Sequence, residues 1–310
     1  MTEDSPALVT GGAGFIGSHL VDALLERGAR VRVLDDFSTG RRKNLAGVLE
    51  RIELIEGDLR DPEVCRRAAE GVDTVFHQAA LGSVPRSMKD PATTVAVNVA
   101  GTANLFAAAR DAAVRRIVYA SSSSVYGDST ALPKREGEEG RPLSPYALSK
   151  AMNEELAAVF ADCFRMELVG LRYFNVFGPR QNPAGPYAAV IPRFFAACRA
   201  GEAPAIHGDG EQSRDFTYVD DAVRANLFAA AAPATACGRA YNVAGGRRAT
   251  INRIAATVRA LVGDCPEPVH GPPRPGDVRH SAADLTAARE ALGYVPEVSL
   301  GEGLERTAAG

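Results

Sequence analysis

Residues 10–17 of this chain read Thr-Gly-Gly-Ala-Gly-Phe-Ile-Gly, and this stretch decides the fold. An apolar run at residues 7–10 predicts a strand before it, and apolar side chains at helical spacing over residues 15–27 predict a helix after it. Glycines in such a turn let a pyrophosphate approach the backbone, where amide groups at the start of the helix favour its negative charge. The stretch therefore predicts a dinucleotide site. Two glycine spacings fit it: G-x-G-x-x-G at Gly12, Gly14 and Gly17, and G-x-x-G-x-x-G at Gly11, Gly14 and Gly17.

Short apolar runs alternate with helical stretches up to about residue 175. This alternation predicts an α/β fold with a doubly wound parallel Rossmann sheet, because helices then cover both faces of the strands. The expected strands span residues 31–34, 52–55, 72–77, 116–120 and 168–173, and the expected helices span 63–70, 93–113 and 146–164. Later elements are shorter and richer in proline. We expect a cofactor-binding Rossmann domain at residues 1–175 and a smaller α/β C-terminal substrate domain at 176–310, with segments such as 240–243 returning to the main sheet.

Composition narrows the class of protein. The 310 residues include 35 Lys and Arg against 38 Asp and Glu, a net charge of −3, which argues against nucleic-acid or anionic-membrane partners. No run approaches 18 uninterrupted apolar residues, and the short acidic start lacks the features of a signal peptide, so we expect no membrane span and a cytoplasmic location. Widely spaced cysteines predict reduced thiols, with no metal site and no disulfide. They are Cys65, Cys163, Cys198, Cys237 and Cys265.

An acidic residue indicates which dinucleotide is bound. Asp35 lies 18 residues past Gly17, where a second strand is expected to end. A carboxylate there accepts hydrogen bonds from the adenosine ribose hydroxyls and repels a 2′-phosphate, which favours NAD over NADP. Asp36 is a second candidate for this role, whereas Arg41 and Arg42 keep NADP open as an alternative. After the third expected strand, Asp58 and Leu59 are candidates to border the adenine, with an ordinary turn as the alternative for Asp58.

Tyr146 and Lys150 form a Tyr-x-x-x-Lys pair at the start of an expected helix. Residues four apart share a helix face, and an ammonium near a phenol lowers the tyrosine pKa from about 10. Such a tyrosine can act as a general base and acid near neutral pH. The pair alone occurs often by chance as exposed helix residues, but here a run of four serines, residues 121–124, precedes it at the end of an expected strand.

In this order the motifs resemble those of the extended short-chain dehydrogenase/reductase superfamily. The resemblance covers nearly the whole chain and rests on residues 10–17, Asn98, the serine run with Val125-Tyr126-Gly127, and Ser144-Pro145-Tyr146-Ala147-Leu148-Ser149-Lys150. Within the superfamily the chain is similar to the UDP-hexose 4-epimerases, whose segments match residues 172–179, 208–216 and 274–277. The resemblance implies an enzyme with tightly bound NAD that inverts C4 of a UDP-hexose through a transient 4-keto intermediate.

The resemblance also implies roles for individual residues. The catalytic residues are expected to be Ser122, Tyr146 and Lys150. The expected cofactor-binding residues are Gly11, Gly14, Phe15, Ile16, Gly17, Asp35, Asp36, Asp58, Leu59, Ala79, Ala80, Asn98, Tyr146 and Lys150. The expected substrate-binding residues are Ser83, Ser122, Ser123, Ser124, Tyr146, Asn175, Ala189, Val190, Arg214, Arg274, Asp277 and Ser281. No metal is expected. A homodimer through the helices at 93–113 and 146–164 is the expected assembly.

Related activities remain as alternatives. Sugar-nucleotide 4,6-dehydratases and UDP-glucuronate decarboxylases carry acidic residues just after the catalytic serine, where this chain has Ser123, Ser124 and Val125. The small Ser281 is expected to admit a C2 N-acetyl group, unless it is an ordinary surface serine. We therefore expect UDP-GlcNAc/UDP-GalNAc, UDP-glucose/UDP-galactose or both as substrates. A UDP-glucuronate 4-epimerase using Arg86 and Arg180 is the alternative. A non-catalytic dinucleotide-binding regulator is another, although such relatives typically lose the Tyr or the Lys of the pair.

Overall fold

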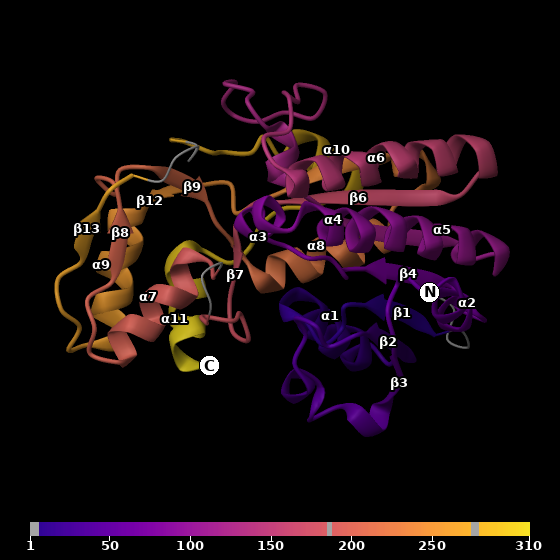
Figure 1. Ribbon diagram of the computed structural model, residues 1–310, viewed down its shortest axis with the longest axis horizontal. Helices are drawn as coiled ribbons and strands as arrows, with labels where there is room; N and C mark the ends of the chain where they lie inside the picture. Colours follow the sequence, from indigo (N-terminus) through magenta and orange to yellow (C-terminus); the bar gives the residue numbers. More distant parts are fainter. Residues whose placement is uncertain (1–5, 185–187, 274–278) are drawn as a thin grey trace.

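The computed structural model describes residues 6–184, 188–273 and 279–310. Within them, seven parallel strands form the main sheet in the order β11-β6-β5-β4-β1-β2-β3 (Figure 1). The chain leaves β1 toward β2 and β3 on one side and toward β4, β5 and β6 on the other, so the order reverses beside β1. The strands are β1 (Ala7–Thr10), β2 (Val31–Asp35), β3 (Ile52–Glu56), β4 (Thr74–His77), β5 (Arg116–Ser122), β6 (Glu167–Tyr173) and β11 (Arg239–Val243).

Helices cover both faces of this sheet because successive strand side chains point to opposite sides. Val9 packs in the core beneath α1 and α8, whereas Leu8 packs in the core beneath α2, α5 and α6. The helices of the first face are α1 (Phe15–Glu26), α8 (Val219–Ala231) and α10 (Thr286–Leu292). Those of the second face are α2 (Pro62–Ala69), α5 (Gly101–Asp111) and α6 (Pro145–Phe164). The expected doubly wound parallel Rossmann sheet is confirmed.

Most of the later elements form a smaller part with its own core (Figure 1). Its helices are α7 (Val190–Arg199), α9 (Ile251–Val262) and α11 (Leu300–Ala309). Its strand pairs are β7 (Val176–Phe177) with β10 (Thr217–Tyr218), β8 (Ala205–His207) with β13 (Val269–Gly271), and β9 (Ser213–Asp215) with β12 (Arg248–Thr250). Between these elements the chain returns to the main sheet, where β11 pairs with β6 and α8 packs against α1.

The single helix expected at residues 93–113 is divided in the structure. It consists of α4 (Pro91–Val95), a π-helical turn η3 (Ala96–Ala100) and α5, and the short helix α3 (Val84–Lys89) precedes it. Together, α4, η3 and α5 form one uninterrupted helical stretch, Pro91–Asp111, which is long and apolar enough to cross a membrane by length and composition alone. In the structure 44% of its apolar window is buried, and its parts pack against α2 and α6. A core helix of a folded domain passes the same test.

The prediction that the chain has no disulfide is wrong at one pair. Cys198 near the end of α7 and Cys265 after α9 are 67 residues apart in sequence, yet they are joined by a disulfide with their Cα atoms 4.8 Å apart. Sequence spacing does not reveal this pair because α7 and α9 become neighbours only through tertiary packing. Cys65, Cys163 and Cys237 are free thiols.

A buried arginine, Arg116, connects the end of α8 to strand β5 of the main sheet. Arg116 begins β5, and its Nη1 donates to the carbonyls of Ala229, Ala230 and Ala232 at the end of α8. Its Nε donates to Glu167 over 2.9 Å. The last carbonyls of a helix have no partner within the helix, and a cation there also favours the helix dipole.

We therefore expect Arg116→Met to lower the free energy of unfolding by about 3 kcal/mol, because it leaves buried carbonyls without their donor and removes the nearer of the two arginines that pair with Glu167. Urea unfolding followed by circular dichroism measures this. The matched control is Arg115→Met, which removes an exposed arginine paired with Asp73 over 3.2 Å and with Glu167 over 3.6 Å, and it should change stability by less than about 1 kcal/mol. Equal losses in the two variants would contradict the role assigned to Arg116.

Candidate active site

A cavity of about 450 Å³ lies at the carboxyl ends of the parallel strands, where the strand order reverses. Ligands bind at this position in open parallel sheets. The structure brings many of the expected site residues together in its wall, from α1 and α6, from the ends of β2 and β5, and from the segments after β1, β3, β4 and β6. They are Gly11, Gly14, Phe15, Ile16, Gly17, Asp35, Asp36, Asp58, Leu59, Ala79, Ala80, Ser122, Tyr146, Lys150 and Asn175.

The glycine turn is shaped by backbone packing. Gly11 has a φ of +68°, and a Cβ added at Gly17 would lie 2.1 Å from the carbonyl oxygen of Gly11. Gly14 precedes α1, and no side chain among the described residues caps this helix at Gly14. The amide groups of Phe15 and Ile16 thus begin α1 at the cavity wall with neither a cap nor a carboxylate in the first turn. This arrangement fits the pyrophosphate of a dinucleotide.

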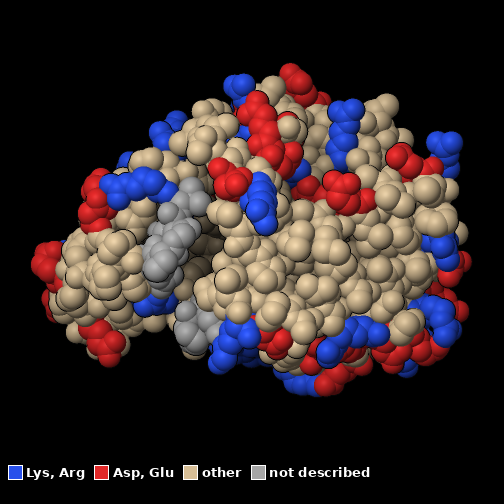
Figure 2. All heavy atoms as spheres, turned by 45° about the horizontal axis from the view of Figure 1, so that its top comes forward, with Lys and Arg blue, Asp and Glu red and all other residues tan. Residues whose placement is uncertain are grey.

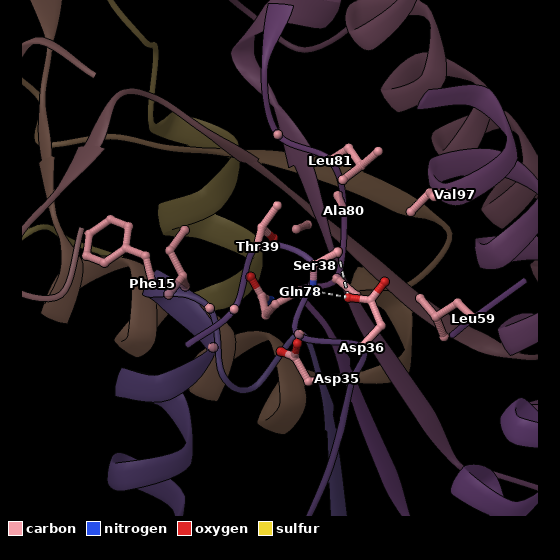
Figure 3. A pocket seen from close by; sticks show the side chains of 18 of the residues that line it. Phe15, Asp35, Asp36, Ser38, Thr39, Leu59, Gln78, Ala80, Leu81 and Val97 are labelled. Atoms are coloured by element: carbon pink, nitrogen blue, oxygen red, sulfur yellow. Dashed lines mark hydrogen bonds between the residues drawn. The ribbon is translucent and has the colours of Figure 1, made fainter. Parts of the chain in front are cut away.

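Asp35 joins the glycine turn to the loop after β2. Its Oδ2 accepts from the amide of Ala13 over 2.9 Å and its Oδ1 from the amide of Phe37 over 2.8 Å. Burial raises the pKa of Asp35, and these amide hydrogen bonds act in the opposite direction. Asp36 is exposed and accepts from the amide and hydroxyl of Ser38, as the dashed lines in Figure 3 show. Each carboxylate oxygen has two lone pairs, so Asp35 retains acceptor capacity toward a ribose.

Arg41 and Arg42, the residues that kept NADP open as an alternative, do not line the cavity in the described part of the chain. Arg42 pairs with Glu56, and its guanidinium lies 4.1 Å from the ring centre of Phe37. Acidic side chains at the end of β2 therefore face the cavity without these arginines, which favours NAD.

Ser122, Tyr146 and Lys150 line the same cavity. Ser122 ends β5, and Tyr146 and Lys150 lie one turn apart at the start of α6, which Ser144 caps through the amide of Ala147. Lys150 is 3% exposed, and its Nζ donates to the carbonyl of Ala120 over 2.7 Å. Ser122 forms a hydrogen bond with Tyr146. The three polar groups are thus held together against the carboxyl end of β5.

Burial controls the protonation of this pair. Burial raises the pKa of Tyr146, and the hydrogen bond with Ser122 acts in the opposite direction. Burial also lowers the pKa of Lys150 to about 8, with Glu154 opposing the change. The expected lowering of the tyrosine pKa by Lys150 is therefore not found in the protein alone. The ammonium is directed at the carbonyl of Ala120, and desolvation of the phenolate dominates.

Other expected residues lie behind or beside the cavity wall. Asn98 is buried in the π-helical turn, where its Oδ1 accepts from the amide of Leu81 over 2.8 Å and its Nδ2 donates to Ser149 over 3.1 Å. It holds a lining residue in place and does not itself line the cavity. Ser83 caps α3 through the amide of Arg86. Ser124 donates to Ser122 over 2.9 Å, and Ser123 begins the same short helical turn η4 (Ser123–Tyr126).

Expected substrate residues of the smaller part are not brought into this cavity. Ala189 and Val190 begin α7, and Arg214 of β9 donates to the carbonyl of Ser213 over 3.0 Å. The amide of Ser281 donates to that carbonyl as well, over 3.0 Å. Arg274 and Asp277 lie outside the described residues. Figure 2 shows that the surface is hollowed between the smaller and the larger part.

The cavity also contains polar residues that sequence reasoning missed. Tyr173 donates to Oε1 of Gln78 over 3.2 Å, and Nε2 of Gln78 donates to Asn226 over 2.9 Å. Nδ2 of Asn226 completes the triangle by donating to Tyr173 over 2.7 Å. Gln78 follows β4 and Tyr173 ends β6, so their place at carboxyl ends of parallel strands was a signal that could have found them.

Known proteins resemble this chain over almost all of its length. A curated UDP-glucose 4-epimerase of Mycolicibacterium smegmatis is 41% identical over 97% of this chain and 96% of its own length. The solved UDP-glucose 4-epimerase of Thermotoga maritima, in complex with UDP-glucose, has a TM-score of 0.93 at 39% identity, covering 98% of this chain and 97% of that one. A UDP-N-acetylglucosamine 4-epimerase of Methanobrevibacter ruminantium, solved with UDP-N-acetylmuramic acid, has a TM-score of 0.94 at 38% identity, covering 99% and 98%.

The family described as NAD dependent epimerase/dehydratase matches residues 7–244. This span includes the glycine turn, Asp35, the serine run and the Tyr146–Lys150 pair. The expectations of the extended short-chain dehydrogenase/reductase superfamily, of an enzyme and of NAD as its cofactor are confirmed. The chain belongs to the NAD dependent epimerase/dehydratase family.

Proposed function

We propose that this chain is a UDP-hexose 4-epimerase that uses NAD. The observation that carries the proposal is that Ser122, Tyr146 and Lys150 share one cavity with the glycine turn and Asp35. A proton-transfer group and a dinucleotide can therefore act on the same sugar carbon. The relatives described above are 4-epimerases of UDP-sugars, which supports the same reaction class.

Tyr146 moves a proton at the C4 hydroxyl of the sugar. When bound, NAD⁺ supplies a reversible hydride acceptor for that carbon. Tyr146 takes the hydroxyl proton as the sugar is oxidised and returns it when the opposite configuration forms, which is general base and then general acid catalysis. Ser122 orients the phenol and the C4 oxygen through hydrogen bonds. The charged form of Lys150 favours the phenolate in a site where burial alone disfavours it.

We propose a neutral or N-acetylated UDP-hexose as the substrate. Dehydration and decarboxylation in relatives use acidic residues that this chain replaces with Ser123 and Ser124. Arg180, a candidate cation for a C6 carboxylate, forms a 2.7 Å ion pair with Asp22 and lines a different recess. The small Ser281 and the similarity to a UDP-N-acetylglucosamine 4-epimerase support an N-acetylated sugar. Faster turnover of UDP-glucuronate than of UDP-N-acetylglucosamine would favour the uronic-acid alternative instead.

We also propose a homodimer formed through α4 and α6. Apolar side chains on these helices and on the adjacent α3 are exposed, and Figure 2 shows a wide area of uncharged side chains on the larger part. They are Met88, Val95, Leu148, Met152 and Val159. Exposed apolar patches of this kind mark contact surfaces.

A cytoplasmic location stays a prediction, and the disulfide between Cys198 and Cys265 is unusual for such a reducing compartment.

Replacement of Tyr146 tests the proposed chemistry directly. We expect Tyr146→Phe to lower kcat by about 10³-fold with UDP-N-acetylglucosamine and UDP-glucose, because phenylalanine lacks the hydroxyl that we propose to move the C4 hydroxyl proton. A coupled assay of the epimerised product measures turnover, and thermal unfolding checks the fold. Tyr241→Phe is the control, since that hydroxyl donates to the carbonyl of Ala236 outside the cavity. A Tyr146→Phe enzyme with the kcat of the parent would contradict the proposed function.

Enlarging Ser281 tests the substrate assignment. We expect Ser281→Tyr to lower kcat/KM for UDP-N-acetylglucosamine by about tenfold or more while UDP-glucose changes by less than about threefold, because the larger side chain would crowd a C2 N-acetyl group. Both substrates are measured with the same preparation. Ser281→Ala is the matched small control and should keep the parent ratio. Equal losses for both sugars would show that Ser281 does not face C2.

The lowered pKa of Lys150 predicts a pH-dependent stability. Between about pH 8 and the ordinary lysine pKa of about 10.4, the unfolded chain binds more protons than the folded chain, so the free energy of unfolding rises with pH. We expect the wild type to gain on the order of 2 kcal/mol relative to Lys150→Met from pH 7 to pH 10. Urea unfolding at each pH measures the difference. Lys89→Met removes an exposed lysine and should show no such trend.

A further inference from the structure

A buried ion pair lies directly behind the catalytic pair. Arg172 of β6 is 6% exposed, and its Nε and Nη2 donate to the two carboxylate oxygens of Glu154 over 3.0 and 2.7 Å. Glu154 belongs to α6 and follows Lys150 by four residues, so both side chains lie on one face of the helix. Two parallel hydrogen bonds hold a carboxylate in a defined orientation.

Glu154 also contacts the end of β5. Its Oε1 accepts the hydroxyl of Ser121, which itself lines the cavity. Ser121 lies between Ala120, whose carbonyl accepts from Lys150 over 2.7 Å, and Ser122, which forms a hydrogen bond with Tyr146. The ion pair therefore restrains residues 120–122, the segment whose ends contact Lys150 and Tyr146.

The other side of Arg172 fixes the segment that follows. Its Nη1 donates to the hydroxyl of Tyr126 over 3.0 Å and to Glu139. Tyr126 in turn donates to Asn242 of β11 over 2.8 Å. Since Tyr126 closes the helical turn that starts after Ser122, Arg172 restrains the serine from both directions along the chain.

We propose that Glu154 is a positioning residue for Tyr146 and Lys150: held by Arg172, it anchors Ser121 and places its negative charge behind Lys150. This inference rests on the proposed function for its effect on turnover, whereas its effect on Lys150 does not need that function. Arg172 acts through Glu154 and touches neither Tyr146 nor Lys150 in the described contacts.

The charges around Lys150 support a specific role for Glu154. Burial lowers the pKa of Lys150 and Glu154 opposes this change. His77 of β4 also faces Lys150, but burial and that lysine lower the pKa of His77 to about 3, so it is neutral. Tyr146 carries no charge near neutral pH, and the guanidinium of Arg172 is paired. Among the described residues around Lys150, Glu154 is therefore the carboxylate that favours its ammonium form.

The test compares variants that change either the charge or the contact. Glu154→Gln should lower the pKa of Lys150 by about one unit, because a carboxylate one helical turn away no longer favours the ammonium. Glu139→Gln removes the other carboxylate from the same arginine, and Glu155→Gln removes an exposed carboxylate from the same helix. Both controls should leave the pKa of Lys150 within about 0.3 units. Nuclear magnetic resonance of ¹³Cε-lysine-labelled protein with NAD measures this pKa, and Lys150→Met assigns the signal.

Two further variants separate position from charge. Ser121→Ala and Glu154→Asp keep the negative charge but lose the contact with β5, so kcat should fall by about tenfold while the pKa of Lys150 stays near its parent value. In Glu154→Gln the alkaline limit of the kcat–pH profile should move to lower pH by the same shift as the pKa.

The outcomes separate this proposal from the proposed function. An unchanged Lys150 pKa in a folded Glu154→Gln protein would show that Glu154 does not act on Lys150 and would overturn the proposal. If Glu154→Gln does not fold, parent-like kcat in both Ser121→Ala and Glu154→Asp overturns the proposal. A wild type that turns over no UDP-sugar refutes the proposed function, and the Lys150 pKa then still decides the role of Glu154.

Discussion

The contact between the first turn of α1 and the end of β1 is the constraint on which the site depends. A Cβ at Gly17 would lie 2.1 Å from the carbonyl oxygen of Gly11, so the helix can begin this close to the strand only with glycine. The close approach sets the uncapped start of α1 against the ends of β2 and β4. Asp35 secures the same turn through the amide of Ala13, so one backbone arrangement provides both the anion-binding amides and the acidic wall.

A second constraint is the low dielectric environment behind the cavity. Burial disfavours the phenolate of Tyr146 and the ammonium of Lys150 alike, and both are held by neighbours on β5. Buried charges are stable only when they are paired, and Arg172 meets this requirement with Glu154 and Glu139. Among the described residues, Arg172, Glu154 and Glu139 lie behind the cavity wall, and Glu154 reaches that wall through the hydroxyl of Ser121.

The later half of the chain does more than form a separate part for a substrate. β11 extends the main sheet beside β6, and α8 covers the face that α1 begins. Arg116 joins α8 to β5, and Asn226 of α8 reaches Tyr173 and Gln78 at the cavity. Tertiary contacts of this kind make the cavity a product of the whole chain, although the motifs of its wall occur in the first 175 residues.

The sequence alone determined the order of the main strands and helices up to about residue 175, the glycine turn, Asp35 and the Tyr146–Lys150 pair. These features are readable because each depends on residues close together in the chain: alternation of apolar segments, glycine spacing, and one helical turn between two side chains. Only the tertiary structure decided the disulfide between Cys198 and Cys265, the hydrogen bond by which Asn98 holds Leu81 from behind the cavity, and the ion pair of Glu154 with Arg172. Each of these contacts joins residues that are far apart in sequence. The distances between these residues, their burial and their hydrogen-bond partners are therefore set only when the sheet and helices pack together.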